Sequence, residues 1–253
     1  MPKNMKIVTA ITALLMFVLT AFAQSGKPLL VGAERMADYV PGLAGKNVGL
    51  VVNHTSIVGP NQTHLVDTLL AQKIKVTKVF APEHGFRGMA DAGQEIKTET
   101  DPKTGLPVIS LYGNTKKPTP EHLKGLDVVI FDIQDVGARF YTYISTMHYV
   151  MEACAEAGIP VIILDRPNPN GFYVDGPIME EKYKSFVGMH PIPVVHGLTV
   201  GELAQMINGQ KWLAKGVQCN ITVIPCFGYT HQTMYQLPVK PSPNLPNMES
   251  IYL

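Results

Sequence analysis

The sequence predicts an α/β protein built on an open, mainly parallel sheet, and three observations carry that prediction. Near-continuous apolar runs, typical of strands buried on both faces of a parallel sheet, recur along the chain. Helix-like segments separate the runs at the spacing of βαβ units. The runs end in polar or ionisable residues, and open α/β sheets bind ligands at the carboxyl ends of their strands.

Five apolar runs are the expected strands of this sheet. In chain order they are VGLVVN (48–53), VTKVFA (76–81), LPVISL (106–111), DVVIFDIQD (127–135) and PVIILD (160–165). A further run, NITVIP (220–225), has the same character. Their lack of polar alternation indicates strands that helices cover on both faces.

Capping residues and helical spacing indicate the helices. Residues 61–72 are expected to form a helix after the first strand. Thr119 is an expected N-cap because Pro120 and an acidic residue follow it, and Thr199 forms a capping-box pattern with Glu202. One more helix is marked by apolar residues at helical spacing that end at a glycine: Ile144, Met147, Met151, Cys154 and Gly158.

The first 23 residues have the pattern of a signal peptide. Two lysines precede an apolar stretch at 7–20, and Ala21 and Ala23 form a small-residue cleavage pattern. The alternative is a membrane anchor, but the apolar stretch is shorter than the about 20 residues that span a bilayer. We therefore expect residues 1–23 to be removed and the chain to be exported, to the periplasm or outside the cell, without a stable membrane anchor.

The net charge bears on the partners of the chain, and the cysteine positions bear on its disulfides. The net charge of +1 and the 16% of charged residues give no electrostatic reason to expect nucleic acid or an anionic membrane as partner. Cys154 is expected to be a buried free thiol. Cys219 and Cys226 flank a strand-like run, and extended chain would hold them too far apart for a disulfide. No pattern indicates an oligomeric state.

APEHGFRG (81–88) is the sharpest local signal for chemistry. Glu83, His84 and Arg87 stand together at a strand end among glycines, which let the backbone approach a ligand closely. A carboxyl group in suitable surroundings acts as a general acid, so Glu83 is a candidate catalytic residue. The alternative is an ion pair between Glu83 and Arg87 that holds a loop.

DIQDVGARFYTY (132–143) is the second signal. Its polar residues include Asp132, Gln134, Asp135, Arg139 and Tyr141. Paired acids with an arginine suit sugar hydroxyls, a second catalytic carboxylate, or recognition of a substrate carboxylate by the arginine. The alternative is a structural pair of Asp135 with Arg139.

Three other strand ends contribute candidates. Asp165 and Arg166 begin LDRPNPNG and either orient groups in the site or belong to a rigid turn. Asn53 and His54 follow the first run, and His196 ends a later one. The alternative for the two histidines is a structural role.

No cofactor or metal is expected. The rival use of His54, His84, Asp132 and His196 is a metal site, but no HxH, HExxH or DxD spacing supports one. No GxGxxG follows the first run, and the chain has no GKS/T loop and no GxSxG elbow. These absences argue against a nucleotide-binding protein.

Several long motifs point to one family. They are VGLVVNHTS, APEHGFRG, TGLPVISLYG, DVVIFDIQDVGARFYTYISTM, LDRPNPNG, YVDGP, SFVGMHPIPVVHGLTVGELA and LPVKPSPNLPN. From about Val48 to Leu253, the chain resembles the NamZ-type exo-β-N-acetylmuramidase family, formerly described as a domain of unknown function. Members release N-acetylmuramic acid from the non-reducing end of peptidoglycan fragments. Their N-terminal domain is Rossmann-like, and a smaller C-terminal domain closes the cleft.

The resemblance implies a Rossmann-like, doubly wound catalytic domain at 24–236, then a Pro-rich linker and the beginning of a truncated C-terminal domain at 237–253. Glu83 is implied as the catalytic acid, and Asp132 or Asp135 as the second carboxylate of a glycoside hydrolase, by retention or inversion. The residues expected to line the saccharide or muropeptide subsite are Asn53, His54, His84, Arg87, Gln134, Arg139, Tyr141, Asp165, Arg166 and His196. The alternative is a module that binds muropeptides without cleaving them.

Overall fold

A computed structural model describes residues 28–87 and 99–252 of the chain. Its core is a seven-stranded sheet in the order β5-β6-β4-β1-β7-β8-β9. The strands are β1 (Val48–Val52), β4 (Val76–Ala81), β5 (Glu99–Thr100), β6 (Pro107–Ser110), β7 (Val128–Asp132), β8 (Val161–Leu164) and β9 (Ile221–Ile224). Neighbouring strands are parallel except β5, which is antiparallel to β6. The expected open, mainly parallel sheet is confirmed.

The strand order is that of a Rossmann-like sheet. Numbered along the chain, the parallel strands lie in the order 3-2-1-4-5-6, with β1 and β7 side by side at the centre. The chain winds outward from β1 through β4 to β6 and then returns to the other side of β1 at β7. Open α/β sheets bind ligands in the crevice at such a reversal, which here lies beyond the pair of Val52 and Asp132.

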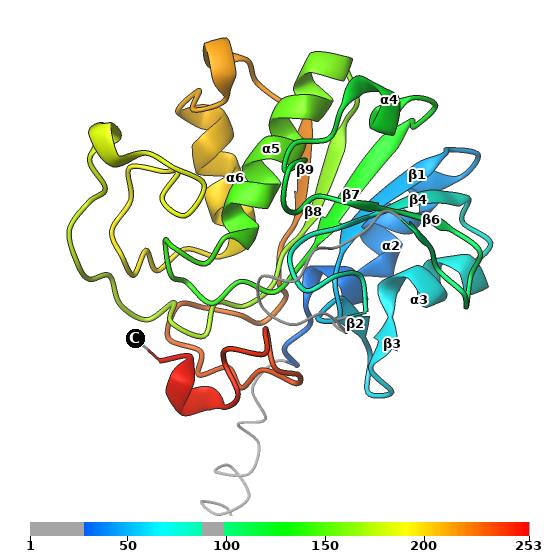
Figure 1. The fold of residues 1–253 in the computed structure, drawn as a ribbon. Coiled ribbons are helices and arrows are strands. Elements are labelled where there is room, and N and C mark those ends of the chain that lie inside the picture. The colour runs from blue at the N-terminus through cyan, green and yellow to red at the C-terminus, as the bar shows by residue number, and fades with distance from the viewer. Residues whose placement is uncertain (1–27, 88–98, 253) are drawn as a thin grey trace, which may run out of the picture.

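Helices cover both faces of the sheet (Figure 1). One face carries α4 (Pro120–Leu123), α5 (Tyr143–Ala157) and α6 (Val200–Gly209), and the other carries α2 (Met36–Tyr39) and α3 (Leu65–Ala71). Val51 packs in the cluster that includes α5 and α6, whereas Leu50 and Val52 pack in the cluster that includes α3. Every residue of β1 is buried, which explains why its sequence shows no polar alternation.

Helix ends follow the capping residues of the sequence. The Thr119 hydroxyl accepts a hydrogen bond from the His122 amide, and the Thr199 hydroxyl accepts one from the Glu202 amide. Helix α5 stops at Gly158, whose φ of 69° is left-handed.

The helix expected at 61–72 is shorter than the sequence suggests. Helix α3 begins at Leu65, because the residues before it form a hairpin of β2 (Ile57–Val58) and β3 (Thr63–His64). The His64 ring caps the helix by accepting a hydrogen bond from the backbone two residues on. The hairpin separates the end of β1 from the helix, so the strand-to-helix turn of a dinucleotide site is not formed.

The remaining elements are 3-10 helices: η1 (Gly32–Glu34), η2 (Val40–Leu43), η3 (Glu181–Tyr183), η4 (Ala214–Gly216) and η5 (Met248–Ser250). No helix within 28–87 or 99–252 is long and apolar enough to cross a bilayer. The expected signal peptide lies outside the described residues. Cys154, Cys219 and Cys226 are free thiols, as their positions predict.

Candidate active site

A pocket of about 340 Å³ lies at the carboxyl edge of the sheet, a size within the range of small-molecule sites. Three of the expected site residues line it: Glu83, His84 and Tyr141. His84 and Tyr143 are buried, whereas Phe140 and Val187, which line the same pocket, are 54% and 58% exposed. The pocket therefore has a buried end at His84 and an open mouth at Phe140.

A tight turn directly after β4 presents Glu83. The Gly85 amide donates a hydrogen bond to the Pro82 carbonyl at 3.0 Å. His84 and Gly85 both have positive φ, 69° and 78°. This conformation is uncommon for a histidine, and backbone strain of this kind concentrates at functional sites. The turn leaves the partly buried Glu83 on the pocket wall.

Tyrosines surround Glu83. The Tyr143 hydroxyl donates to the Glu83 backbone carbonyl at 3.5 Å. Tyr112 follows β6, the neighbour of β4, and its phenol lies near the Glu83 carboxylate. Burial and, secondly, this carboxylate raise the pKa of Tyr112. The phenol of Tyr112 therefore stays protonated beside the Glu83 side chain.

Asp135 and His196 form a second polar pair at the same edge. Asp135 Oδ2 accepts a hydrogen bond from the Gly137 amide at 2.8 Å and lies 3.5 Å from His196 Nε2. His196 Nδ1 accepts from the Leu198 amide at 3.2 Å, which assigns the proton of a neutral ring to Nε2, facing the carboxylate. Among the described residues, Asp135 Oδ1 has no hydrogen-bond partner. This buried oxygen is an acceptor that a ligand or a water molecule would satisfy.

Asn53 and Gln134 join the ends of β1 and β7. Asn53 Oδ1 accepts from the Thr55 amide and hydroxyl at 2.9 and 2.6 Å, and the same hydroxyl accepts from the Gln134 amide at 3.0 Å. The Gln134 side chain donates to the Asp135 and Pro167 carbonyls, both at 2.7 Å. Its Oε1 has no partner in the described part of the chain. Both side chains thus hold loops in place. The Oε1 atom of Gln134 remains available to accept a hydrogen bond from a ligand or a water molecule.

Asp132 and Arg166 differ from expectation. Arg166 Nε and Nη2 donate to the two Asp132 carboxylate oxygens at 2.6 and 2.9 Å, and both residues are buried. Arg166 Nη2 also lies 3.2 Å from the Ile57 carbonyl, to which it donates. Two buried opposite charges satisfy each other in this bidentate geometry. The pair favours a structural role for Asp132 over the expected second catalytic carboxylate, and a structural role for Arg166 over the expected substrate contact.

Both carboxylate oxygens of Asp165 also accept hydrogen bonds from other protein groups. Its Oδ1 accepts from the Gly201 and Arg166 amides at 2.7 and 3.0 Å, and its Oδ2 accepts from the Thr199 hydroxyl at 2.9 Å. The carboxylate therefore anchors the N-terminus of α6, where the helix dipole favours negative charge. Burial raises the pKa of Asp165 to about 6, against the effect of these hydrogen bonds.

The two other expected arginine contacts likewise bind protein atoms. Arg87 Nε and Nη2 donate to the two Asp101 carboxylate oxygens at 3.0 and 2.9 Å, in place of the alternative pair with Glu83. Arg139 Nη1 donates to the Pro177 and Ile192 carbonyls, both at 2.7 Å, in place of the alternative pair with Asp135. Each arginine holds a loop beside the site, so neither geometry supports a direct substrate contact.

Residues 236–252, the C-terminal segment, cross the carboxyl edge of the sheet. His54 Nε2 donates to the Lys240 carbonyl at 2.7 Å, and the Tyr141 hydroxyl donates to the Pro241 carbonyl at 2.9 Å. Burial lowers the pKa of His54, although the Lys240 carbonyl acts in the opposite direction. His54 and Tyr141, both expected to line the subsite, anchor this segment, and Tyr141 also lines the Glu83 pocket.

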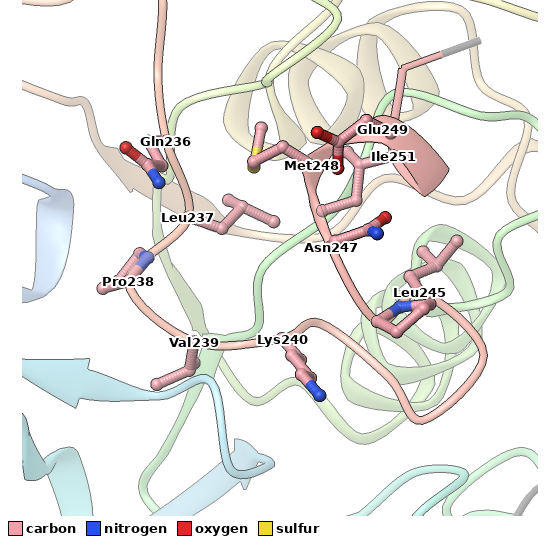
Figure 2. A pocket seen from close by; sticks show the side chains of 11 residues that line it. Gln236, Leu237, Pro238, Val239, Lys240, Leu245, Asn247, Met248, Glu249 and Ile251 are labelled. Carbon is pink, nitrogen blue, oxygen red and sulfur yellow. The ribbon is translucent and has the colours of Figure 1, made fainter.

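The segment also encloses its own small apolar cluster. Asn170 Nδ2 donates to the Ile251 carbonyl at 2.8 Å. Leu237, Leu245 and Met248 pack with Ile251 against the loop after β7. Figure 2 shows the hollow that these residues line as the chain turns back on itself. Ile251 and Leu245 also line the Glu83 pocket, so the C-terminal segment supplies one of its walls.

Contributors to this edge that were missed from the sequence include Tyr112, Phe140, Tyr143, Asn170 and Val187. Tyr112 lies two residues after β6 within TGLPVISLYG, and Asn170 lies in the turn after β8 within LDRPNPNG. Phe140 stands inside DIQDVGARFYTY, where the acids and the arginine drew attention. Position after a strand was the available signal, and it applies to aromatic and amide side chains as much as to charged ones.

The strand order and the Glu83 pocket define the class of protein: a Rossmann-like α/β domain with a polar site at the carboxyl edge of its sheet. Among the described residues, no three His, Cys, Asp or Glu side chains are arranged to hold a metal ion. The family described as "Exo-beta-N-acetylmuramidase NamZ, N-terminal" matches residues 48–249. The chain belongs to this family.

Known proteins agree with this assignment. The chain is 48% identical, over 224 residues, to the peptidoglycan beta-N-acetylmuramidase NamZ of Bacillus subtilis (strain 168) and covers 53% of that protein's length. Two solved structures of DUF1343 family proteins from Bacteroides fragilis share the fold. BF0379 is 52% identical with a TM-score of 0.80, and the match covers 89% of this chain and 59% of that one. BF0371 is 40% identical with a TM-score of 0.79, and the match covers 88% of this chain and 57% of that one.

Proposed function

We propose that this domain carries the chemistry of an exo-acting glycoside hydrolase that releases N-acetylmuramic acid from the non-reducing end of peptidoglycan fragments. The observation that carries the proposal is Glu83, a partly buried carboxyl group on the wall of a pocket with one buried end. Membership of the NamZ family supports the substrate class. The chain spans about half the length of the curated relative it matches, 53%.

Glu83 is the proposed general acid. Its carboxyl proton passes to the glycosidic oxygen as the bond from that oxygen to the muramic acid ring breaks, and water supplies the new hydroxyl. Tyr112 lies near the carboxyl group, and the strained turn at His84 fixes the backbone of the residue beside it. Correct placement of the reacting atoms is itself a large part of catalysis.

Asp135 is the proposed second carboxylate. Asp132 has both oxygens engaged by Arg166, whereas Asp135 Oδ1 has no partner among the described residues. His196 Nε2 lies 3.5 Å from Asp135 Oδ2, so the ring and the carboxyl group form one polar pair at this edge. The anomer first released, followed by proton NMR, distinguishes a retaining reaction from an inverting one.

Release of free N-acetylmuramic acid from a MurNAc–GlcNAc disaccharide tests the function. The chain from Gln24 onward should cleave the disaccharide, and Glu83→Gln should lower kcat by about 10²–10⁴-fold while the disaccharide still binds. Glu121→Gln, at an exposed position on α4, is the matched control.

A chimera with the C-terminal half of the Bacillus subtilis relative tests whether further chain is needed. Binding without cleavage in both the chain and the chimera would replace the enzyme with a muropeptide-binding module. Full activity of Glu83→Gln would remove Glu83 from the mechanism.

Export is a second part of the proposal. The pattern at residues 1–23 supports it. N-terminal sequencing of the protein recovered from the periplasm or culture medium should begin at Gln24. Recovery only from the cytoplasm, with Met1 intact, would contradict it.

A further inference from the structure

Phe140 is an aromatic side chain held largely in water at the mouth of the Glu83 pocket. It lines the pocket and is 54% exposed, and Val187, which is 58% exposed, lines the same pocket. Small-molecule pockets are lined predominantly by apolar and aromatic side chains, so exposed ones at a pocket mouth are candidates for ligand contacts. The two side chains form an apolar rim around a pocket whose inner end carries Glu83 and His84.

The backbone on both sides of Phe140 is firmly held. The Tyr141 amide donates to the Ala138 carbonyl at 2.9 Å, and the Arg139 amide donates to the Val194 carbonyl at 2.8 Å. The Arg139 side chain adds two more hydrogen bonds to the loop that faces it. Phe140 is thus displayed from a fixed turn, and its exposure is a property of the folded backbone.

Val187 is displayed in a comparable way. Ser185 and Gly188 exchange backbone hydrogen bonds of 3.0 and 3.2 Å, which closes a tight turn around it. Within that turn, the Phe186 ring stacks on Tyr149 of α5, with centroids 6.0 Å apart and planes 13° apart. Because both sides of the rim are fixed before a ligand arrives, binding loses little conformational entropy there.

The chemistry of the rim fits a sugar ring. A pyranose carries hydroxyls at its edge and C–H groups on its faces, so an aromatic ring can cover a face while polar groups meet the edge. Thr142, Asn244 and Ser250 line the same pocket and offer such polar groups.

Resting on the proposed function, we propose that Phe140 and Val187 form the subsite for the leaving sugar. The muramic acid ring occupies the buried end, Glu83 stands at the glycosidic oxygen, and the next sugar packs one face on the Phe140 ring. Phe140 is a specificity-determining residue in this arrangement: it selects an amino-sugar leaving group over a small one.

Two substrates with different leaving groups test the proposal: the MurNAc–GlcNAc disaccharide and the methyl glycoside of N-acetylmuramic acid. Phe140→Ala should raise KM for the disaccharide about 10-fold, from lost aromatic packing, and change KM for the methyl glycoside less than about 2-fold. Phe140→Tyr should restore the wild-type KM. Phe227→Ala is the matched control, since Phe227 is 42% exposed and does not line the pocket.

An equal rise in KM for both substrates would mean that Phe140 only shapes the Glu83 pocket. An unchanged KM for both would mean that no sugar binds the rim. Either result overturns the proposal. If the wild-type chain cleaves neither substrate, the proposed function fails separately. The affinity of each protein for the disaccharide, measured by calorimetry, then tests the subsite. Weaker binding by Phe140→Ala than by the wild-type chain supports the subsite, and equal binding by the two proteins contradicts it.

Discussion

Asp132 and Arg166 form a buried bidentate ion pair beneath the carboxyl edge of the sheet, with Nε–Oδ1 and Nη2–Oδ2 distances of 2.6 and 2.9 Å. Asp132 ends β7 and Arg166 follows β8, so the pair joins two neighbouring strand ends. Because the two side chains bind each other, neither is free to bind a ligand. Glu83 and Asp135 are then the carboxyl groups available for chemistry.

Breaking this pair on one side should unfold the domain more readily. Asp132→Asn leaves the Arg166 charge buried without its partner, which costs about 3–5 kcal/mol of unfolding free energy. Replacing both residues, Asp132→Leu with Arg166→Met, should cost less than the single change. Urea unfolding measures the difference; a loss below about 1 kcal/mol for Asp132→Asn would show that the pair is not desolvated.

Asp135→Asn should lower turnover strongly without unfolding the protein. If Asp135 is the second carboxylate, kcat for the disaccharide falls by about 10²-fold or more. Asp175→Asn, at an exposed position, is the control and should keep full activity. A variant Asp135→Asn that retains more than a third of wild-type kcat would favour participation by the acetamido group of the substrate.

Asn170→Ala should loosen the C-terminal segment. Asn170 Nδ2 donates to the Val136 and Ile251 carbonyls, both at 2.8 Å, and leaving these buried acceptors unpaired costs about 1–3 kcal/mol. Amide hydrogen exchange in residues 237–252 should accelerate, and KM should rise because the segment walls the pocket.

Asn61→Ala, at an exposed loop position, is the control for this change. Unchanged exchange in the segment would mean that His54 and Tyr141 suffice to hold it.

The Arg87–Asp101 pair should make stability depend on acid. Hydrogen bonds from Arg87 hold the pKa of Asp101 at about 2, below its ordinary value of 3.8. Since the unfolded chain binds this proton first, the contribution is complete above about pH 4 and is lost as pH falls through about 2. Asp101→Asn should cost at most about 2 kcal/mol at pH 7, because Arg87 is partly exposed.

Urea unfolding of wild type and Asp101→Asn at pH 7, 5 and 3 measures this dependence. The gap between the two proteins should narrow towards pH 3. A difference in unfolding free energy that stays constant with pH would show that the Arg87–Asp101 pair does not cause the pH dependence of stability.

The sequence alone determined the sheet and most helix ends. Buried strands such as 48–52 read as unbroken apolar runs because both faces are covered. Thr119 and Thr199 could be identified as caps because a cap interacts only with the next turn of its own helix. The one misplaced helix start, at 61 instead of 65, arose because pairing of β2 with β3 overrode local helix preference.

The sequence also located the edge where the site lies, since every parallel strand delivers its following residues to the same edge. The sequence did not reveal which acidic side chain pairs with which arginine at this edge. Arg87 pairs with Asp101 rather than with nearby Glu83, and Arg166 pairs with Asp132 rather than with adjacent Asp165. Such choices depend on distances between chain segments that are remote in sequence.

Only the tertiary structure therefore decided which ionisable residues remain for a ligand. Local pattern specifies backbone geometry because helices, strands and caps are short-range. The availability of a side chain is a long-range property, because it is set by whichever donor or acceptor the fold brings within about 3 Å. Glu83 and Asp135 Oδ1 stand out from the other acids for that reason, and Phe140 stands out because the fold leaves it exposed.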